Sequence, residues 1–344
     1  MTAPFLPDAP TVSSPGPGQP GRSANTTPSP AADHSRTADT SAASPTFSIV
    51  IATYNYGHLI ERAIQSVLHQ THAPHEIIVV DDGSTDDTAE RMRRYADRVR
   101  YVRKENEGQS SAYNLGALTA SADFVYILDA DDELCPDALS RFSHAVVEAR
   151  RAGRADGIFY GGYESVSVHG KRRIRQSVQA PSDPFERLKT FIERKLTGLQ
   201  NGAFIIPRAA FESIRYPEDI RHNTDLVFIG HALTRYPATA IDAIVLRSHE
   251  HPMRSRKRRH SNIAHGIRPV DCLFNPKEMD ARFLVLKKDL LAARLRSLGR
   301  MNYLAGDFAN TRTAYRSAFR LKPRAVADLG SLKRWFVAEA RVWL

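Results

Sequence analysis

Three aspartates, Asp129, Asp131 and Asp132, follow directly after an apolar run at 124–128. A short apolar run bounded by charge is typical of a strand buried on both faces of a parallel sheet, and such sheets bind ligands beyond the carboxyl ends of their strands. In an extended chain Asp129 and Asp131 point the same way. Clustered carboxylates repel one another unless a cation lies between them, and hard oxygen ligands suit Mg²⁺ or Mn²⁺. Alone, the cluster fits either a metal site or a solvated acidic loop.

The same plan, a buried strand followed by polar residues, occurs earlier in the chain. We expect strands at 47–52, 77–80 and 99–103, because each is an apolar or β-branched run bounded by turn residues. The second of these strands ends in Asp81 and Asp82. Segments with helical spacing of apolar residues separate the strands. This alternation predicts βαβ units on a parallel sheet, which places both acidic clusters at one edge.

The composition sets limits on the number of domains and on the partners. The chain has 344 residues, a net charge of +10, 42% hydrophobic residues and two cysteines, which is enough for one large core plus an appendage. Residues 1–45 are rich in Pro, Ser, Thr and Ala and are expected to be disordered. The basic balance favours anionic ligands. No nucleic-acid-binding motif accompanies it, so we expect no nucleic-acid partner.

Targeting patterns and cysteine usage indicate a cytoplasmic protein. The start of the chain lacks a charged segment followed by an apolar one, so no signal peptide is expected. No apolar run of about 20 residues predicts a membrane-spanning helix. Cys135 and Cys272 form no disulfide framework and suit a reducing compartment.

Five motifs together carry a resemblance to a known family. In chain order they are IVIATYN at 49–55, VVDDGSTD at 79–86, NEG at 106–108, NLG at 114–116 and LDADD at 128–132. This series resembles the family 2 glycosyltransferases, which are inverting enzymes. The match is strong over about 45–140 and looser to about 255.

The resemblance implies an α/β fold of the GT-A type, the fold of nucleotide-diphospho-sugar transferases. Its Rossmann-like mixed sheet would carry helices on both faces, with a C-terminal helical appendage. The expected organisation is a disordered tail at 1–45, a catalytic domain at 46–255, a basic linker or lid at 256–278 and a helical region at 279–344. Within the catalytic domain, 46–140 would bind the donor and 141–255 the acceptor.

The resemblance also implies roles for the polar residues at the strand ends. A nucleotide-sugar has a diphosphate leaving group, and a divalent ion, Mn²⁺ or Mg²⁺, stabilises the charge that develops on it. Asp82 would accept a hydrogen bond from the nucleotide base. The implied metal ligands are Asp131, Asp132 and His249. The implied donor-binding residues are Thr53, Tyr54, Asn55, Asp82, Asn114, Asp129 and Asp131.

Inversion requires a base that takes the proton of the acceptor hydroxyl. The family supplies it from a Glu-Asp pair at the start of a helix, and here Thr224 occupies the Glu position while Asp225 keeps the second acidic place. Asp225 is therefore the expected base, with Glu218 and Asp219 as substitutes. The alternative is that Asp225 only complements the helix dipole. A second departure is Tyr113, which stands where the family commonly has Arg.

Two further segments leave alternatives open. His249, or else His251, would complete the metal site after the last strand. The basic run at 254–259 could be a lid over the donor phosphates, a patch for an anionic membrane or acidic saccharide, or a solvated face. Gln200 and Asn201 could face the acceptor or simply form a turn.

The tail from about 279 has helical spacing of apolar residues, and 299–324 resembles one tetratricopeptide-like hairpin. A single hairpin is too short for a repeat array, so we expect it to pack on the catalytic domain. The last helix combines Trp335, Phe336 and Trp343 with basic residues. It could lie on a membrane surface or pack within the tail.

These inferences lead to one expected function and two alternatives. The expected protein is a metal-dependent inverting hexosyltransferase that moves a sugar from a UDP-sugar donor to a saccharide or lipid-linked saccharide acceptor. Its expected context is bacterial cell-surface polysaccharide synthesis, in the cytoplasm or at the inner face of the plasma membrane. The first alternative is an inactive GT-A-like sugar- or nucleotide-binding protein, suggested by Thr224 and Tyr113. The second is a receiver-like signalling domain, which also has acids after a buried strand.

Overall fold

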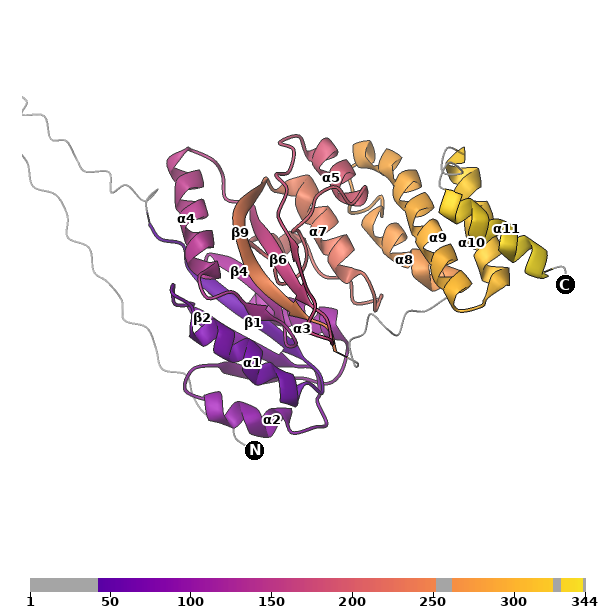
Figure 1. Cartoon of the computed structure of the whole chain (residues 1–344). Coiled ribbons are helices and arrows are strands. Elements are labelled where there is room, and N and C mark those ends of the chain that lie inside the picture. The colour runs from indigo at the N-terminus through magenta and orange to yellow at the C-terminus, as the bar shows by residue number, and fades with distance from the viewer. Residues whose placement is uncertain (1–42, 252–261, 324–328, 343–344) are drawn as a thin grey trace, which may run out of the picture. The chain divides into compact units, whose positions relative to one another are not determined.

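The apolar runs predicted as strands form the parallel half of one sheet (Figure 1). The computed structural model describes residues 43–251, 262–323 and 329–342. The parallel strands, in the spatial order β3-β2-β1-β4, are β1 (Phe47–Thr53), β2 (Glu76–Asp81), β3 (Arg100–Arg103) and β4 (Phe124–Asp129). The elements between them are α1 (Gly57–Leu68), α2 (Thr88–Met92), η2 (Arg93–Tyr95) and α3 (Gln109–Thr119). All four strand predictions are confirmed.

The second half of the nine-stranded sheet is mixed in direction. It continues from β4 in the order β8-β6-β9-β5, with β7 paired to β6; β8 runs antiparallel to β4, while β9 runs parallel to β6. Its strands are β5 (Glu133–Leu134), β6 (Ile158–Val166), β7 (Arg172–Arg175), β8 (Phe204–Pro207) and β9 (Ala238–His249). Its helices are α4 (Ala138–Arg151), α5 (Pro184–Ile192), α6 (Ala210–Ser213) and α7 (Thr224–Arg235). The helix predicted to start near Asp225 is therefore present.

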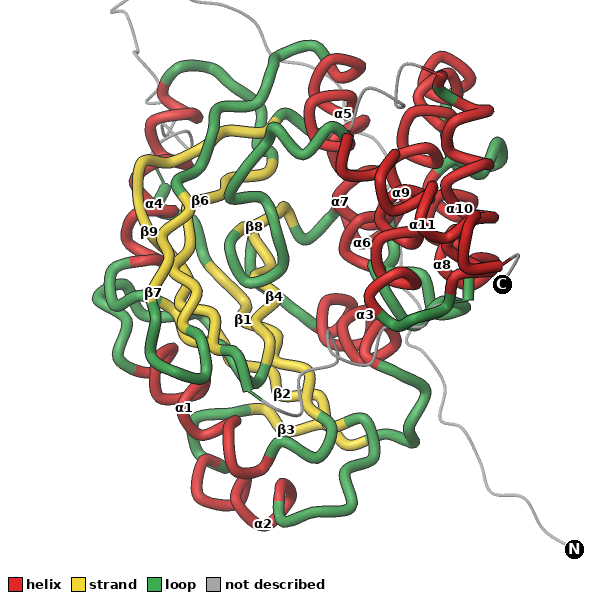
Figure 2. Tube along the Cα trace, turned by 45° about the vertical axis from the view of Figure 1, so that its right-hand side comes forward, coloured by secondary structure: helices red, strands yellow, loops and turns green. Residues whose placement is uncertain are grey.

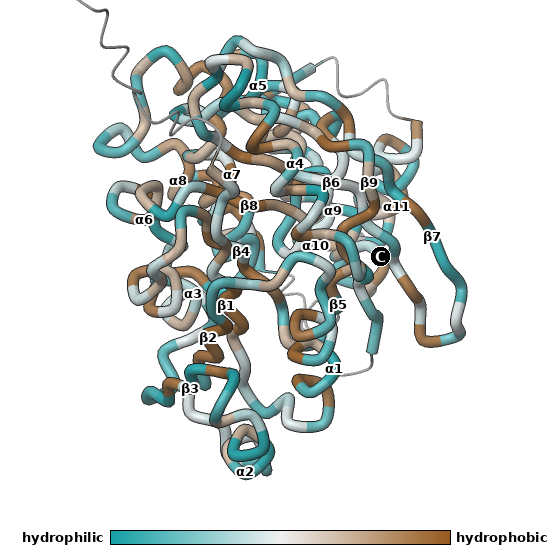
Figure 3. The backbone as a smooth tube through the Cα atoms, turned by 90° about the vertical axis from the view of Figure 1, so that its left-hand side faces the viewer, coloured by the Kyte–Doolittle hydropathy of each residue, from teal (hydrophilic) through white to brown (hydrophobic). Residues whose placement is uncertain are grey.

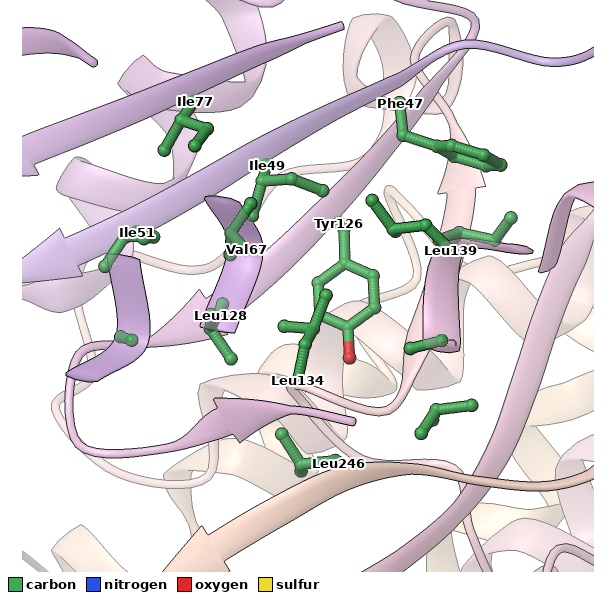
Figure 4. Packing of buried hydrophobic residues seen from close by; sticks show 14 of the residues in the cluster. Phe47, Ile49, Ile51, Val67, Ile77, Tyr126, Leu128, Leu134, Leu139 and Leu246 are labelled. Carbon is green, nitrogen blue, oxygen red and sulfur yellow. The ribbon is translucent and has the colours of Figure 1, made fainter. Parts of the chain in front are cut away.

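Side chains on the two faces of the sheet belong to separate apolar clusters. Along β1, Ile49 and Ile51 enter the cluster covered by α1 (Figure 4). Val50 enters the cluster covered by α3. This alternation is the period of two of a strand buried on both sides. Figure 3 shows the apolar residues concentrated along β1 and β2, while α2 is hydrophilic. The predicted mixed α/β sheet with helices on both faces is confirmed.

A third apolar cluster joins the catalytic half to the C-terminal helices. These helices gather on the α7 side of the sheet (Figure 2). They are α8 (Ile263–Leu273), η4 (Ala281–Leu286), α9 (Lys287–Leu304), α10 (Phe308–Leu321) and α11 (Leu329–Val342). Leu188 of α5 and Val227 of α7 share the cluster with Leu273 and Phe283, so α8 and η4 pack on the catalytic half. No described residue of the expected hairpin at 299–324 belongs to this cluster, and its packing on the catalytic domain stays a prediction.

Two predictions about the C-terminal region have different outcomes. Residues 256–278 were expected as a linker or lid, but 263–273 form α8, because Val270 and Leu273 are fully buried against α7. In α11, Trp335 packs edge-on against Phe319 of α10 at 5.8 Å between ring centroids. This contact favours packing within the tail over a free amphipathic helix.

Residues 40–344 form one compact unit. The predicted disorder of 1–45 falls almost entirely outside the described residues, and so does the basic run at 254–259. Across the described ranges, no helix is both long and apolar enough to cross a bilayer.

Candidate active site

The acidic cluster lies at the carboxyl end of β4, as predicted. Asp129 is the last residue of that strand, and Asp131 and Asp132 are only 4% and 2% exposed. One carboxylate oxygen from each of the three residues lies within 4.8 Å of the others. Burial makes mutual repulsion of the charges stronger than it would be in water. A solvated acidic loop does not describe such a cluster.

Two histidines from the end of β9 approach the acids in different ways. The ring Nε2 of His251 lies 3.0 Å from Oδ2 of Asp131. His249 instead donates its backbone N–H to Asp132 at 3.0 Å, and its ring Nε2 lies 2.7 Å from Oε1 of Glu133. Burial and the charge of Arg62 lower the pKa of His249, although Glu133 opposes them. The geometry therefore favours His251 over His249 as the imidazole of the acidic site.

Tyr113 occupies the place of the cation that the family pattern led us to expect. Its side chain is fully buried, and its hydroxyl donates to Asp129 Oδ1. Gln109 Nε2 donates to the same oxygen at 3.3 Å. Burial, reinforced by the charge of Asp129, raises the pKa of Tyr113 well above its ordinary value, so the phenol stays a neutral donor. The hydrogen bonds of Tyr113 and Gln109 thus orient Asp129.

The chemistry of this donor set fits a divalent cation. Three carboxylates supply hard oxygen ligands, which Mg²⁺ and Mn²⁺ prefer, and an imidazole such as that of His251 is compatible with Mn²⁺. The residues that would hold the ion are Asp129, Asp131 and Asp132. The backbone around them is fixed, because an Arg62 guanidinium N–H donates to the carbonyl of Asp131 at 2.7 Å.

The expected nucleoside-binding residues lie in the turns after β1 and β2. Thr53 is 3% exposed, and its hydroxyl has no hydrogen-bond partner in the part of the chain that the structure describes. Tyr54 is 47% exposed. Asn55 has φ +56°, and its Oδ1 accepts N–H groups of Thr85 and Asp86 at 2.7 and 3.3 Å. Asn55 therefore ties the two turns together.

Asp82 is buried and engaged with the loop after β3. It accepts backbone N–H groups of Glu107 at 3.0 Å and Gly108 at 2.7 Å, and Lys104 Nζ lies 3.1 Å from its Oδ1. Gly108 has φ +108°, a conformation that favours glycine. Asp82 thus shapes the rim of the expected base pocket, and a direct contact with the base stays a prediction.

Asn114 joins α3 to the segment before α7. Its Nδ2 donates to the carbonyl of Tyr216 at 2.9 Å and to Glu218 at 2.8 Å, and its Oδ1 accepts the Tyr216 N–H at 2.9 Å. Asn114 is 5% exposed and does not line the cavity described next. These bonds give Asn114 a structural role, and a contact with the donor stays a prediction.

A cavity of about 320 Å³ brings the acidic cluster and the predicted base together. Asp129, Asp131 and Asp132 line it on one side, and Asp225 lines it from the first turn of α7. Gln200 and Asn201 also line the cavity. This agrees with the alternative that they face the acceptor. Asn201 Oδ1 accepts the Tyr216 hydroxyl at 2.8 Å, which fixes its amide.

Of the three acids considered for the base, only Asp225 lines this cavity. Glu218 binds Asn114, and Asp219 pairs with Arg268 at 2.8 Å. Asn223, which precedes α7, has φ +57° and also lines the cavity. A left-handed residue other than glycine at a cavity wall is a strained conformation of the kind that gathers at functional sites.

Sequence reasoning missed part of the cavity wall. Its unpredicted members come from the end of α5, the loop before α7, and the C-terminal helices: Arg194, Arg221, His222, His265, Gly266, Arg294, Ser297 and Met301. No local pattern marks these residues, because their place depends on how α8 and α9 pack. The positive φ of Arg194, +59°, is equally invisible in the sequence.

A parallel first half of the sheet, a mixed second half and acids at the end of β4 define a GT-A-type glycosyltransferase fold. The structure resembles that of TarS from S. aureus, with a TM-score of 0.58 at 16% identity, over 86% of this chain and 55% of TarS. The TarS fragment 1–349 gives a TM-score of 0.56 at 17% identity, over 86% of this chain and 90% of the fragment. A receiver-type domain is thereby excluded.

The sequence comparisons point to the same class of protein. Residues 48–215 match the model of glycosyl transferase family 2. An uncharacterized glycosyltransferase of Nostoc sp. is 38% identical over 138 residues, 39% of this chain and 41% of that protein. A Campylobacter jejuni protein named as a GalNAc(5)-diNAcBac-PP-undecaprenol beta-1,3-glucosyltransferase is 40% identical over 101 residues, 28% of this chain and 33% of its own. The chain spans less than half the length of these relatives.

Proposed function

We propose that the protein is a metal-dependent inverting glycosyltransferase that transfers a hexose from a UDP-sugar to a saccharide or lipid-linked saccharide. The observation that carries this proposal is the single cavity lined by both the buried acidic cluster and Asp225. The acidic cluster suits the donor diphosphate with its cation, and Asp225 suits the acceptor. Transfer with inversion needs both.

Asp129, Asp131 and Asp132 would hold the donor through a divalent ion. Such an ion neutralises charge on the departing diphosphate when bound. Tyr113 and Gln109 orient Asp129, and His251 contacts Asp131, so the oxygens are held in place before the donor arrives. Preorganised groups avoid a reorganisation cost during reaction.

Asp225 would accept the proton of the acceptor hydroxyl as that oxygen attacks the sugar carbon opposite the leaving diphosphate. The new bond joins the acceptor oxygen to this carbon, and the bond from the carbon to the diphosphate breaks with its electrons staying on phosphate oxygen. The N-terminal position of Asp225 on α7 favours the carboxylate form, because the helix dipole stabilises negative charge there. A carboxylate is the form that can act as base.

Relatives support the substrate classes. TarS residues 1–349 were crystallised with UDP-GlcNAc, and that structure matches this one with a TM-score of 0.51 at 16% identity, over 80% of this chain and 92% of the fragment. The C. jejuni relative is named for an undecaprenol-linked acceptor. A role in bacterial cell-surface polysaccharide synthesis, at the cytoplasmic face of the membrane, fits these names.

A screen of nucleotide-sugars for thermal stabilisation, with and without Mn²⁺, tests the proposal. A donor that binds only the folded state raises Tm in proportion to the logarithm of its concentration over Kd. We expect a Mn²⁺-dependent shift with a UDP-sugar that is lost in Asp131→Asn. The control Asp97→Asn changes an exposed aspartate of the same charge and should keep the shift. An equal shift in Asp131→Asn would contradict the assignment of the metal site.

An inactive nucleotide-sugar-binding protein is the second candidate, favoured by Thr224 in place of the family's Glu. Product analysis separates it from an enzyme. Release of free sugar from the bound donor, or transfer to an acceptor, establishes catalysis. Binding without either would establish the second candidate.

A further inference from the structure

The cavity that Asp225 lines also carries basic residues. Arg194, Arg221 and Arg294 line it, with His265 beside them. We propose that these arginines bind an oxyanion, a phosphate or a carboxylate, carried by the acceptor. This inference rests on the proposed function and narrows it to an anionic acceptor.

Arg221 lies close to the predicted base along the chain. It comes four residues before Asp225, which is in the first turn of α7, and both line the cavity. The donor phosphates are assigned to the acids at the end of β4. An arginine next to the group that receives the acceptor proton is placed to hold the acceptor.

An anionic acceptor would need cations in this cavity. Four carboxylates line the cavity, Asp129, Asp131, Asp132 and Asp225, and together they would repel any anionic acceptor. Within the described ranges neither Arg194 nor Arg221 forms an ion pair with a carboxylate, and both are exposed to the solvent at the cavity. Their charge is thus not already neutralised by a described acid. The planar guanidinium pairs with two oxygens of a phosphate or carboxylate at once.

Arg194 adopts a conformation that its residue type does not favour. It follows α5 in a helix-ending turn in which its N–H donates to Phe191 O at 2.9 Å and the Lys195 N–H donates to Thr190 O at 3.0 Å. The residue at this position of such a turn is usually glycine, since φ is positive, here +59°. An arginine side chain at the cavity is therefore retained at the expense of backbone strain.

Arg294 fixes the far side of the wall. It lies on α9, and its Nε donates to the carbonyl of Gly266 on α8 at 2.7 Å. This bond anchors the guanidinium between two helices that both line the cavity. The C-terminal helices thus contribute a positioned cation to the site.

The test uses the full chain saturated with UDP and Mn²⁺ and titrates glycerol 3-phosphate, glucuronate and the neutral methyl glucoside by calorimetry. We expect one of the two anions to bind and methyl glucoside to bind at least 10-fold more weakly. Which anion binds distinguishes phosphate from carboxylate. Arg221→Gln and Arg294→Gln should weaken this binding at least 10-fold while the Kd for UDP changes less than 2-fold. Arg268→Gln, on α8 but paired with Asp219 outside the cavity lining, is the matched control.

Arg194→Gly separates a loss of anion binding from a loss of folding. Glycine relieves the positive φ, so Tm should rise while anion binding falls at least 10-fold. A loss of UDP affinity in Arg221→Gln or Arg294→Gln would assign the arginines to the donor and overturn the inference. Binding of UDP with no binding of either anion would overturn it too and leave the proposed function intact. Failure of the wild-type chain to bind UDP would instead refute the proposed function.

Discussion

Asp225 lies in the first turn of α7 and is the acid of its segment that lines the cavity. If it is the base, Asp225→Asn removes proton transfer but leaves the acidic cluster unchanged. We expect kcat to fall roughly 10²- to 10⁴-fold, the usual contribution of a general base. The Kd for UDP with Mn²⁺ should stay within 2-fold. Initial rates of sugar transfer and UDP titration measure the two effects.

Asp219→Asn is the control for this substitution, since Asp219 precedes the same helix but pairs with Arg268 outside the cavity lining. Its turnover should match that of the wild type. Full activity in Asp225→Asn would show that another group accepts the proton, and Asp225 would then be a helix-dipole acid.

The sequence predicts the positions of some site residues but not of others. Asp131 and Asp132 were predictable because they directly follow a buried strand, so their position depends on local structure. The choice between His249 and His251 was not. The strand β9 ends at His249, and beyond it the alternation that assigns side chains to a face no longer applies. The hydrogen bonds of Asn114 could not be predicted because its partners lie about 100 positions later, at Tyr216 and Glu218.

The helix α3 packs closely on the parallel half of the sheet. A Cβ added at Gly116 would lie 2.3 Å from Val50 Cγ1 and 3.2 Å from Val80 Cγ2. Val50 and Val80 are fully buried, so the helix has to move. We expect Gly116→Ala to lower the free energy of unfolding by about 1–3 kcal/mol, as overpacking does. Denaturant unfolding measures this change in the free energy of unfolding. The control is Leu118→Ala, at an exposed position of the same helix, which should stay within about 0.5 kcal/mol of the wild type. Equal stability of the two variants would refute the tight packing.

A buried histidine couples α7 to α8 and makes their contact sensitive to pH. His231 is 4% exposed, and its Nε2 donates to Leu273 O at 2.9 Å. Burial lowers the pKa of His231. The unfolded chain takes up this proton below about pH 6.5, while the folded chain resists it, so stability falls as pH falls through that value.

Chemical denaturation at pH 7.5, 6.5 and 5.5 tests this coupling. His231→Gln keeps a donor for Leu273 but cannot titrate, so its stability should decrease less on acidification than that of the wild type. The exposed His144 supplies the comparison, and His144→Gln should retain the wild-type slope. Identical slopes for all three proteins would exclude His231 as the source.

Elements were predictable where the apolar pattern was strong. The strands β1, β2 and β4 are continuous apolar runs, and α7 begins at an acid followed by apolar residues at helical spacing. The helix α8 was missed, since it contains Pro269 and follows the basic run. Tertiary burial of Val270 and Leu273 stabilises it despite the proline.

At the scale of the whole molecule, the structure implies that the tail and the sheet unfold together. Phe283 is 1% exposed and stacks on Phe185 of the catalytic half at 6.3 Å between ring centroids. Phe283→Ala should cost about 3–5 kcal/mol. Both tryptophans, Trp335 and Trp343, lie in the tail, so their fluorescence reports on that region alone.

The measurement compares the fluorescence transition with loss of UDP binding on heating. Both midpoints should fall together in Phe283→Ala. Val285→Ala, at a 68% exposed position of the same segment, should move neither. A shift of the fluorescence transition alone would show that the tail is an independent domain.

The residues that line the cavity run from Tyr56 to Met301 along the chain. During synthesis an N-terminal sheet can fold early, because domains form as the chain emerges. The cavity, however, stays open on one side until α9 has left the ribosome and docked. The cavity is therefore complete only after Met301 has been synthesised and α9 has packed against the rest of the fold.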